Sequence, residues 1–409
     1  RRHTRDSWQS RGLGDVYKRQ TGGTAGTGGT TDPGVWRGAV LIEQDDEGDA
    51  QEPQLAGSAA GDAVVVWLHL VGERNDVWSN AYDPGTGWKN AEWIEHREDD
   101  TDAPQVSMSP DGRHAMAAWT QLDETEISNV WVNHYEGAWR SEGTVLDDDP
   151  SSYAHSPQVA IYPGGAAKVV WLEQFRSFSN LWTRRFVPGE IPWQQGWRAA
   201  EQFATDTDEV AIPVLVGYDD SGATAAWREA DLIGHPNVWT SRYDTVGLAW
   251  GTAEPAGTTD ALLVEDIRLV ADRGSNVMAV WHQVNGANNG VWANRYDVDW
   301  GWGDPEPLES DTSVPPVPEV AMDPAGNAIV VWAHWDESMS DQNIMAKRYD
   351  VRDGWQAAEV IDVGFRDASH PHVAMDSAGN AMAVWRQQND ALPSPHNIWA
   401  SHYDAAARQ

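Results

Sequence analysis

Short runs of alternating apolar and polar residues dominate this chain and recur in the same order along it. An apolar run that ends in tryptophan returns about every fifty residues. The seven copies end at Trp67, Trp119, Trp171, Trp227, Trp281, Trp332 and Trp385. A second run follows each copy, as in VWSNAYD (77–83) and VWANRYD (291–297), and a short turn with another tryptophan comes next in most copies. The period-two alternation predicts β-strands, and no segment keeps the period of a helix.

Each repeat holds four such runs, bounded by Gly, Asp, Asn and Pro, which predicts four-stranded antiparallel units. The stretch MDPAGNAIVVW (322–332) returns nearly unchanged as MDSAGNAMAVW (375–385), and we interpret it as the turn between the first two strands of a unit. Asp323 and Gly326 suit that turn, because Asp tolerates turn geometry and Gly accepts positive φ. Seven such units predict an all-β protein, namely a single seven-bladed β-propeller over residues 33–405.

The two ends of the chain predict how the ring closes. The seventh repeat has no fourth strand before Gln409, whereas VWRGAVLIE (35–43) aligns with fourth-strand segments such as GWQAAEVID (354–362). We therefore expect the N-terminal strand to complete the last blade and remove an open sheet edge. Residues 1–20 fit no repeat and are interpreted as non-native sequence, and the Gly/Thr-rich residues 21–32 predict a disordered tether.

Composition narrows the classes of function. The chain carries 63 acidic against 28 basic residues, a formal net charge of −35. Nucleic acids are therefore not expected as partners, because phosphate neutralisation needs clustered Lys and Arg. The sequence has no cysteine, which excludes disulfides and thiolate chemistry, and no apolar run approaches the length of a membrane-spanning helix. With the tether, these features predict a monomeric extracellular or cell-surface protein, lipid-anchored through a missing N-terminus.

The repeat pattern P-x-V-A-x-D-x-x-G-N-A-x-x-V-W, followed by N-[VI]-W-A-x-R-Y-D, resembles the repeats of secreted bacterial propellers of the sialidase-like, BNR-like group. The resemblance covers about residues 33–405 and implies the propeller fold. Sialidase boxes read S-x-D-x-G-x-x-W, whereas this chain has DPAGNAIVVW, which has another spacing and occupies a different hairpin. The arginines that recur in register with the repeat are interpreted as parts of the blades: Arg185, Arg242, Arg295 and Arg348.

Strands alternate in direction within a blade. The turns between strands 1 and 2 and between strands 3 and 4 (the 1–2 and 3–4 turns) therefore lie at one end. The loops between strands 2 and 3, and from strand 4 to the first strand of the next blade (the 2–3 and 4–1 loops), lie at the other. The variable loops belong to the second end, as VGERND (71–76) and VNGANNG (284–290) illustrate, so we expect function there. The residues two positions beyond the repeat tryptophans are all polar and end toward this face: His69, Gln121, Glu173, Glu229, Gln283, His334 and Gln387. They either satisfy polar groups between blades or, with Trp335 in a nearby loop, form a sugar-binding ring.

Acidic residues gather in the 4–1 loops. The candidate metal ligands among them are Asp99, Asp100, Asp102, Asp147, Asp148 and Asp149. Loop carboxylates are ligands that Ca²⁺ prefers, so calcium is a possible cofactor, and the alternative is a solvated acidic rim. Glu265 and Asp266 continue the acidic rim in the fifth unit. Zinc is the weaker alternative, because the histidines do not form an evident set of three or four ligands.

These observations predict a non-catalytic module that binds a glycan or a protein through the acidic loop face, with no catalytic residue assigned. The alternative is a glycoside hydrolase or lyase, for which Glu173 and Glu229 from adjacent units are a candidate carboxylate pair. If one blade is specialised, we expect it to be the fourth or the seventh, whose loops depart most from the repeat. The residues to inspect there are Glu229, His235, His370, His372 and His396.

Overall fold

A computed structural model describes most of the chain from residue 49 onward. Not described are residues 1–48, 59–60, 98, 148–150, 176–177, 190–192, 205–209, 219–221, 231–233, 259–260, 287, 310–315, 337–340, 363–367, 389–395, 404 and 406–409. The expectations for residues 1–20, for the tether 21–32 and for the strand 35–43 therefore fall outside the described residues. All described residues belong to one compact unit, residues 42–409.

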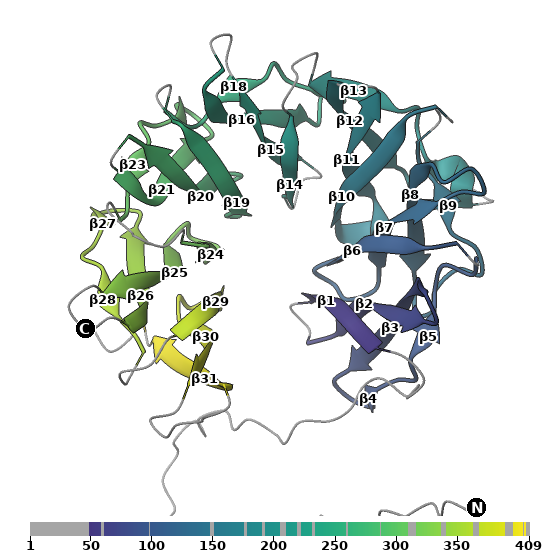
Figure 1. Ribbon diagram of the computed structural model, residues 1–409, viewed down its shortest axis with the longest axis horizontal. Coiled ribbons are helices and arrows are strands. Elements are labelled where there is room, and N and C mark those ends of the chain that lie inside the picture. Colours follow the sequence, from purple (N-terminus) through teal and green to yellow (C-terminus); the bar gives the residue numbers. More distant parts are fainter. Residues whose placement is uncertain are drawn as a thin grey trace, which may run out of the picture. The chain divides into compact units, whose positions relative to one another are not determined.

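Seven antiparallel sheets hold the described strands (Figure 1). The first contains β1 (Asp49–Gly57), β2 (Ala63–Val71), β3 (Arg74–Asp83), β4 (Gly87–Trp88) and β5 (Glu92–Trp93). The second contains β6 (Thr101–Met108), β7 (Ala115–Leu122), β8 (Ser128–Tyr135) and β9 (Thr144–Val145). The third contains β10 (Tyr153–Ile161), β11 (Ala167–Phe175), β12 (Phe178–Phe186) and β13 (Glu201–Ala204).

The other four sheets repeat this order. The fourth contains β14 (Ala211–Gly217), β15 (Ala223–Ala230), β16 (Pro236–Asp244), β17 (Ala249–Trp250) and β18 (Glu254–Pro255). The fifth contains β19 (Leu263–Ala271), β20 (Val277–Asn285), β21 (Asn288–Asp297), β22 (Gly301–Trp302) and β23 (Glu306–Pro307). The sixth contains β24 (Glu319–Met322), β25 (Ala328–Asp336), β26 (Asp341–Asp350), β27 (Gly354–Trp355) and β28 (Glu359–Val360), and the seventh contains β29 (Ala368–Met375), β30 (Ala381–Gln388) and β31 (His396–Tyr403).

Helical structure is minor in the described part of the chain. It consists of two short 3-10 helices, η1 (Pro163–Gly165) and η2 (Trp193–Gly196). Among the same residues, no helix has the length and apolar character needed to cross a bilayer. The predicted all-β class is confirmed.

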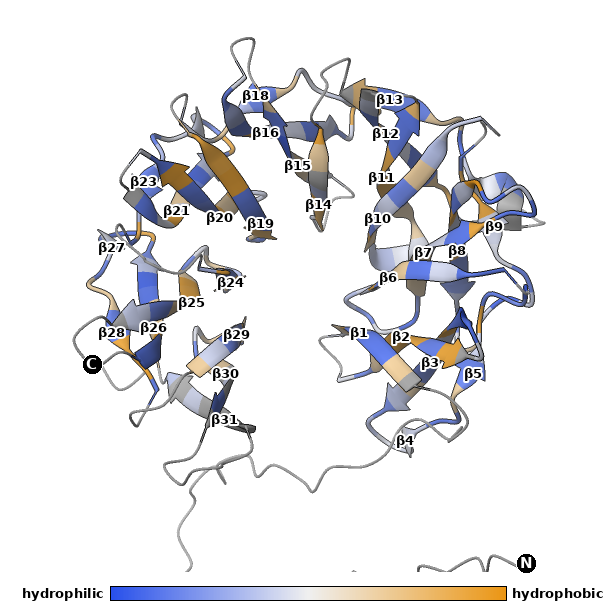
Figure 2. Ribbon diagram, viewed as in Figure 1, coloured by the Kyte–Doolittle hydropathy of each residue, from blue (hydrophilic) through white to orange (hydrophobic). Residues whose placement is uncertain are grey.

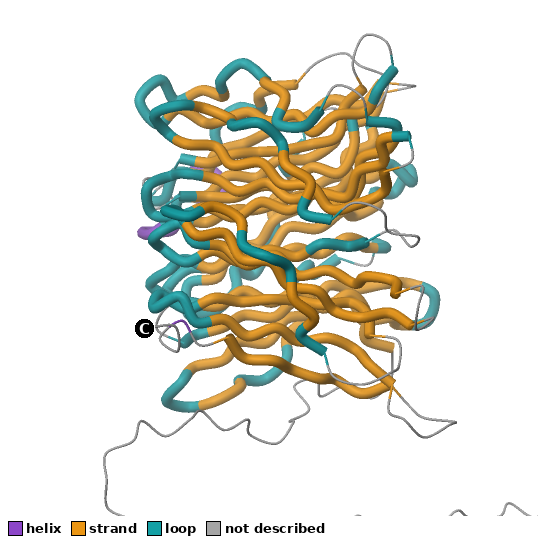
Figure 3. The backbone as a smooth tube through the Cα atoms, turned by 90° about the vertical axis from the view of Figure 1, so that its left-hand side faces the viewer, coloured by secondary structure: helices purple, strands orange, loops and turns teal. Residues whose placement is uncertain are grey.

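Successive sheets follow one another in a propeller-like arrangement. The first strand of each sheet contacts the first strand of the next, from β1 through β6, β10, β14, β19 and β24 to β29. Figure 1 shows these first strands toward the middle, with the later strands of each sheet farther out. Because all pairings are antiparallel, the 1–2 and 3–4 turns of a sheet lie at one end of its strands and the 2–3 loops lie at the other, as predicted. Figure 3 shows the loops at the two ends of the strands.

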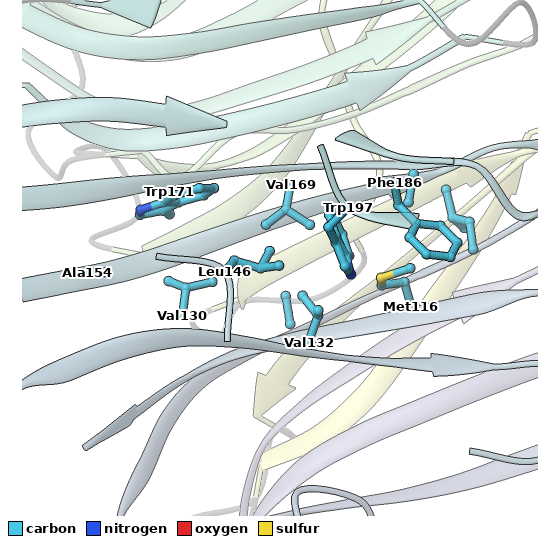
Figure 4. Packing of buried hydrophobic residues seen from close by; sticks show 12 residues of the cluster. Met116, Val130, Val132, Leu146, Ala154, Val169, Trp171, Phe186 and Trp197 are labelled. Atoms are coloured by element: carbon cyan, nitrogen blue, oxygen red, sulfur yellow. The ribbon is translucent and has the colours of Figure 1, made fainter. Parts of the chain in front are cut away.

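The core lies between the sheets and is built around the repeat tryptophans. Trp119, Trp171 and Trp281 on second strands are fully buried. Trp171 of the third sheet packs in one cluster with Val130 and Leu146 of the second, and Figure 4 shows these side chains facing one another. The second strands are buried on both faces by neighbouring sheets, which explains their continuous apolar runs. Figure 2 shows hydrophobic segments within the strands and hydrophilic residues in many of the connecting turns.

The near-identical stretches 322–332 and 375–385 form the predicted turns between first and second strands. Gly326 has a φ of 89°, in the left-handed region that favours glycine. The Asp323 Oδ1 atom accepts hydrogen bonds from the backbone N–H of Ala325 at 2.9 Å and of Asn327 at 3.0 Å. The repeated Asp and Gly residues therefore serve the architecture at this place.

Two segments that we expected to be loops are largely strand. Within 71–76, Val71 pairs with Arg74, so that β2 and β3 are joined by a two-residue connection. Within 284–290, Asn285 pairs with Asn288. Trp335, expected in a loop, lies in β25 opposite Gln342. The polar side chains suggested loops, but backbone pairing extends these hairpins beyond the last apolar residue.

The recurring arginines connect neighbouring sheets. The Arg242 guanidinium lies 4.0 Å from the ring centre of Tyr296 in the next sheet. Arg295 lies over Tyr349 at 5.8 Å, and Arg348 lies over Tyr403 at 5.7 Å. An arginine over the face of a tyrosine is a favourable cation–π contact. The interpretation of these arginines as parts of the blades agrees with this placement.

Candidate functional site

The polar residues two positions beyond the repeat tryptophans mainly hold those tryptophans. In five sheets the indole N–H donates to the polar side chain that follows. The pairs are Trp119–Gln121 at 3.0 Å, Trp171–Glu173 at 3.2 Å, Trp227–Glu229 at 2.6 Å, Trp281–Gln283 at 2.8 Å and Trp385–Gln387 at 3.0 Å. Four of these five acceptor residues are buried, and Glu229 is half-buried. A buried indole N–H needs an acceptor, so these residues serve the core.

Two of the same side chains also bond to a residue just after the preceding sheet. The Gln387 Nε2 atom donates to Asp362 Oδ2 at 3.2 Å, and Gln283 Nε2 donates to Thr258 Oγ1 at 2.6 Å. The Ser152 hydroxyl, one residue before β10 of the same sheet, donates to Glu173 Oε1 at 2.6 Å. The first two contacts favour the interpretation of the ring as hydrogen bonding between blades. The Glu173–Glu229 pair remains only a hypothesis for catalysis, because each carboxylate already bonds to its own tryptophan.

Two sheets carry histidine at this position. His69 is buried with its ring 5.3 Å from that of Trp78, and His334 Nδ1 lies 3.6 Å from Glu309 Oε2. The indole N–H groups of Trp67 and Trp332 have no hydrogen-bond partner among the described atoms. Histidine thus does not replace the amide or carboxylate acceptor of the other sheets.

The described members of the predicted calcium set mostly bind backbone N–H groups. Asp100 Oδ1 accepts from Asn75 N at 2.8 Å, and Asp147 Oδ1 accepts from Val130 N at 2.8 Å. Asp102 accepts from the adjacent Ala103 N at 2.8 Å, and Asp99 lies 3.5 Å from Arg97. Asp148 and Asp149 lie outside the described residues. Calcium binding by this set stays a prediction.

A cleft of about 530 Å³ lies between the sixth and seventh sheets. Lys347, Arg348, Glu359 and Tyr403 line it together with apolar residues of both sheets. Arg348 and Tyr403 form one of the repeated contacts between sheets. Because residues of the blade register line this cleft, it does not distinguish one repeat from the others.

Most of the innermost strands contain a β-bulge, and one of these bulges differs from the others. The register shifts within β1, β6, β10, β14, β19 and β29. In five of them a non-glycine residue at the bulge has a φ between 51° and 54°: Glu52, Ala103, Ser156, Asp266 and His370. Bulges re-aim side chains and are frequent next to active sites. Proline follows this position in all but β19, where Ile267 takes its place.

The bulge of β19 brings three potential ligands together. Glu265 pairs directly with His282 of β20, and Asp266 is the bulge residue with positive φ. One oxygen of each carboxylate and one nitrogen of His282 lie within 4.8 Å of one another. The Glu265 Oε2 atom is 3.9 Å from His282 Nδ1, and the Glu265 side chain is 42% exposed. Among the described residues, this is the group in which three His, Asp or Glu ligand atoms converge.

A cation stands beside this group. Arg268, on the same inner strand, donates through Nε to Glu319 Oε1 of the sixth sheet at 2.9 Å. Its side chain is 33% exposed. The junction of the fifth and sixth sheets thus combines carboxylates, an imidazole and a guanidinium, the groups that acid–base chemistry and anion binding require.

Sequence reasoning missed this group as a unit. It identified Glu265 and Asp266 as acids of the rim, but it examined the second position after each tryptophan, whereas His282 is the first position after Trp281. The fourth and seventh sheets, which we expected to be specialised, bring together no comparable group of ligand atoms among their described residues. Glu229 is bonded to Trp227, and exposed His370 lies 3.0 Å from the adjacent Ser369 hydroxyl. A signal existed in the replacement of the repeated proline by Ile267.

Comparisons with known proteins show the fold. No family model and no curated protein sequence matches the chain. An ulvan lyase of polysaccharide lyase family PL25 superposes with a TM-score of 0.54 at 9% identity, covering 88% of this chain and 97% of that chain. The ulvan lyase bound to -[GlcA(1-4)Rha3S]- gives a TM-score of 0.53 at 10% identity, covering 90% and 95%. The NanB sialidase of Streptococcus pneumoniae gives 0.46 at 8% identity, covering 90% and 70%. The fold is therefore all-β and propeller-like, as in these lyases.

Proposed function

We propose that the protein cleaves a glycan at the junction of the fifth and sixth sheets. The convergence of Glu265, Asp266 and His282 at the bulge of β19 carries this proposal. This arrangement occurs where one repeat departs from its siblings, as a catalytic site requires, whereas most of the near-symmetric polar ring serves the core. The likeness to polysaccharide lyases adds support at the level of the fold. This reading favours the enzyme over the non-catalytic module.

The chemistry follows from the groups present. Glycan cleavage, whether by hydrolysis or by elimination, needs a base and an acid at the scissile linkage. Glu265 is accessible to solvent, and the buried His282 ring lies next to its carboxylate. Arg268 offers a guanidinium that could exchange Glu319 for an anionic sugar substituent. The net charge of −35 repels polyanionic glycans, so a local positive charge is needed if the substrate is acidic.

The test is turnover of a panel that contains ulvan, a sialyllactose and neutral chromogenic glycosides, with products analysed by mass spectrometry and ultraviolet absorbance. A new absorbing double bond identifies a lyase, and its absence from a cleaved product identifies a hydrolase. We expect Glu265→Gln and Asp266→Asn to lower turnover by about a hundredfold or more. Asp299→Asn, an exposed acid of the same sheet, should leave it unchanged. Binding without turnover would support the non-catalytic glycan-binding module instead.

We further propose that the seven sheets close as a seven-bladed propeller through the strand expected at residues 35–43. Two observations support closure: the seventh sheet has three described strands, and the segments aligned with 35–43 form fourth strands in the first and sixth sheets. Deletion of 1–43 should lower the melting temperature and promote association, whereas deletion of 1–32 should do neither. Calorimetry and light scattering measure both effects. Equal stability of the two deletions would count against closure.

The expected location also stays a proposal. An extracellular protein that is held at the cell surface by a lipid anchor and is monomeric in its working form fits a glycan substrate outside the cell. Sequencing of the genomic region upstream of residue 21 tests the anchor.

A further inference from the structure

We propose that Glu265, Asp266 and His282 bind one Zn²⁺ ion. This inference deepens the proposed function, because the ion would supply the local positive charge at the same site, and it rests on that function for its chemical purpose. Metal binding itself is measured without a substrate, so the two proposals can fail separately.

The state of His282 is the first argument. The ring is fully buried, and its Nε2 atom lies 2.6 Å from the Asn289 Oδ1 atom. An amide oxygen only accepts, so this contact matches the tautomer that has its N–H at Nε2 and its lone pair on Nδ1. The Nδ1 atom is buried and has no hydrogen-bond partner among the atoms that the structure describes. It faces the Glu265 carboxylate at 3.9 Å.

A lone pair and two carboxylates that face one another need a positive charge between them. A proton on Nδ1 meets this need for one carboxylate, and a divalent ion meets it for all three groups. Histidine ligands characteristically donate their second N–H to an oxygen acceptor, which fixes the tautomer and the ring orientation. Asn289 provides that acceptor here. The contact with Asn289 therefore orients the imidazole so that Nδ1 can act as a metal ligand.

The bulge of β19 supplies the other two ligands. In a regular strand, Glu265 and Asp266 would point to opposite faces. The extra residue and the positive φ of Asp266 place both carboxylates within 4.8 Å of His282. Ligand atoms on one zinc ion lie roughly 3.3–3.6 Å apart, given bond lengths of about 2.0–2.2 Å. Rotation of the partly exposed Glu265 and Asp266 side chains closes the remaining distance.

The ligand set selects the class of metal. Calcium and magnesium prefer oxygen ligands alone, whereas imidazole favours zinc and other first-row transition metals. Among the ions that accept both donor types, zinc binds more tightly than manganese or iron(II). Three protein ligands with a fourth position open to solvent are typical of catalytic zinc sites. Such an ion would lower the pKa of a bound water and offset the charge that repels an acidic glycan.

The experiment is calorimetric titration of the metal-free, untagged protein with Zn²⁺, and separately with Mn²⁺ and Ca²⁺. We expect one tight Zn²⁺ site, weaker Mn²⁺ binding and no Ca²⁺ binding at this place. Glu265→Gln and Asp266→Asn should each weaken Zn²⁺ binding roughly tenfold or more. Asp299→Asn is the matched control and should bind as the parent does. Because His282 is buried, His282→Gln is interpreted only if its unfolding midpoint matches the parent.

A spectroscopic readout identifies the ligands. The Co²⁺-substituted protein should show visible absorption bands that change in intensity or position in Glu265→Gln. Equal Zn²⁺ affinity of the parent, Glu265→Gln and Asp266→Asn would overturn the proposal, as would the absence of stoichiometric Zn²⁺ binding. Tight zinc binding without glycan turnover would uphold the metal site and reject the proposed function. Glycan turnover together with the absence of stoichiometric Zn²⁺ binding would uphold the proposed function and reject the metal site.

Discussion

Replacement of Trp171 with alanine should lower the free energy of unfolding by about 3–5 kcal/mol, the usual cost of removing a large buried aromatic side chain. Trp171 is fully buried between the second and third sheets, where it packs with Leu146. The substitution leaves a cavity and also removes the N–H donor that Glu173 accepts at 3.2 Å. Urea unfolding followed by circular dichroism measures the shift in midpoint.

The matched control is Trp300→Ala. Trp300 is 88% exposed in the turn between β21 and β22, so its removal should change stability by less than about 0.5 kcal/mol. A Trp171→Ala protein as stable as the Trp300→Ala protein would mean that the sheets do not pack around the repeat tryptophans.

Glu95→Gln should make the protein more stable in mildly alkaline solution. Burial, with a contribution from the nearby Asp76 carboxylate, raises the pKa of the Glu95 carboxyl from 4.5 to about 9. The folded state therefore keeps a proton that the unfolded state loses above its ordinary pKa. It follows that stability falls as pH rises between those values, by up to about 1.4 kcal/mol per pH unit. Glutamine removes this dependence and can still accept from the Val77 N–H, which now bonds to the Glu95 Oε2 atom.

Melting temperatures at pH 5 and pH 8 test this expectation. The advantage of Glu95→Gln over the parent should be larger at pH 8 than at pH 5. Glu124→Gln changes an exposed residue in the β7–β8 connection, so its melting temperature should differ from that of the parent by the same amount at both pH values. A constant difference between Glu95→Gln and the parent across this pH range would show that Glu95 titrates normally in the folded protein.

Local signals made the architecture predictable from the sequence. Asp323 and Gly326 specify their turn through contacts within a few residues, and the tryptophan repeat marks each second strand. Hairpin ends were less predictable. Arg74 and Asn288 are polar, but their backbones pair across the hairpin, and backbone pairing leaves little trace in side-chain polarity.

The candidate site was harder to predict because it depends on a bulge. An extra residue shifts the alternation of side chains by one position after Glu265, so the face of Glu265 cannot be counted back from the longer C-terminal part of β19. Its partner His282 comes from the next strand, and only the pairing register brings the two together. The prolines at the equivalent bulges, such as Pro104 and Pro157, mark the position in other repeats. Ile267 interrupts that mark at the proposed site.

The contacts between arginine and tyrosine of neighbouring sheets all run in one direction, from the fourth sheet toward the seventh. Arg242, Arg295 and Arg348 each reach forward to the tyrosine of the following sheet. Consecutive sheets therefore associate head to tail, like the subunits of a heterologous oligomer, in which rotation between neighbours decides closure. A duplicated repeat inserted between two existing ones would carry both halves of this contact with it. Because an inserted copy would bring both the arginine and the tyrosine, neighbouring near-copies such as 322–332 and 375–385 can arise by duplication without a new interface between sheets.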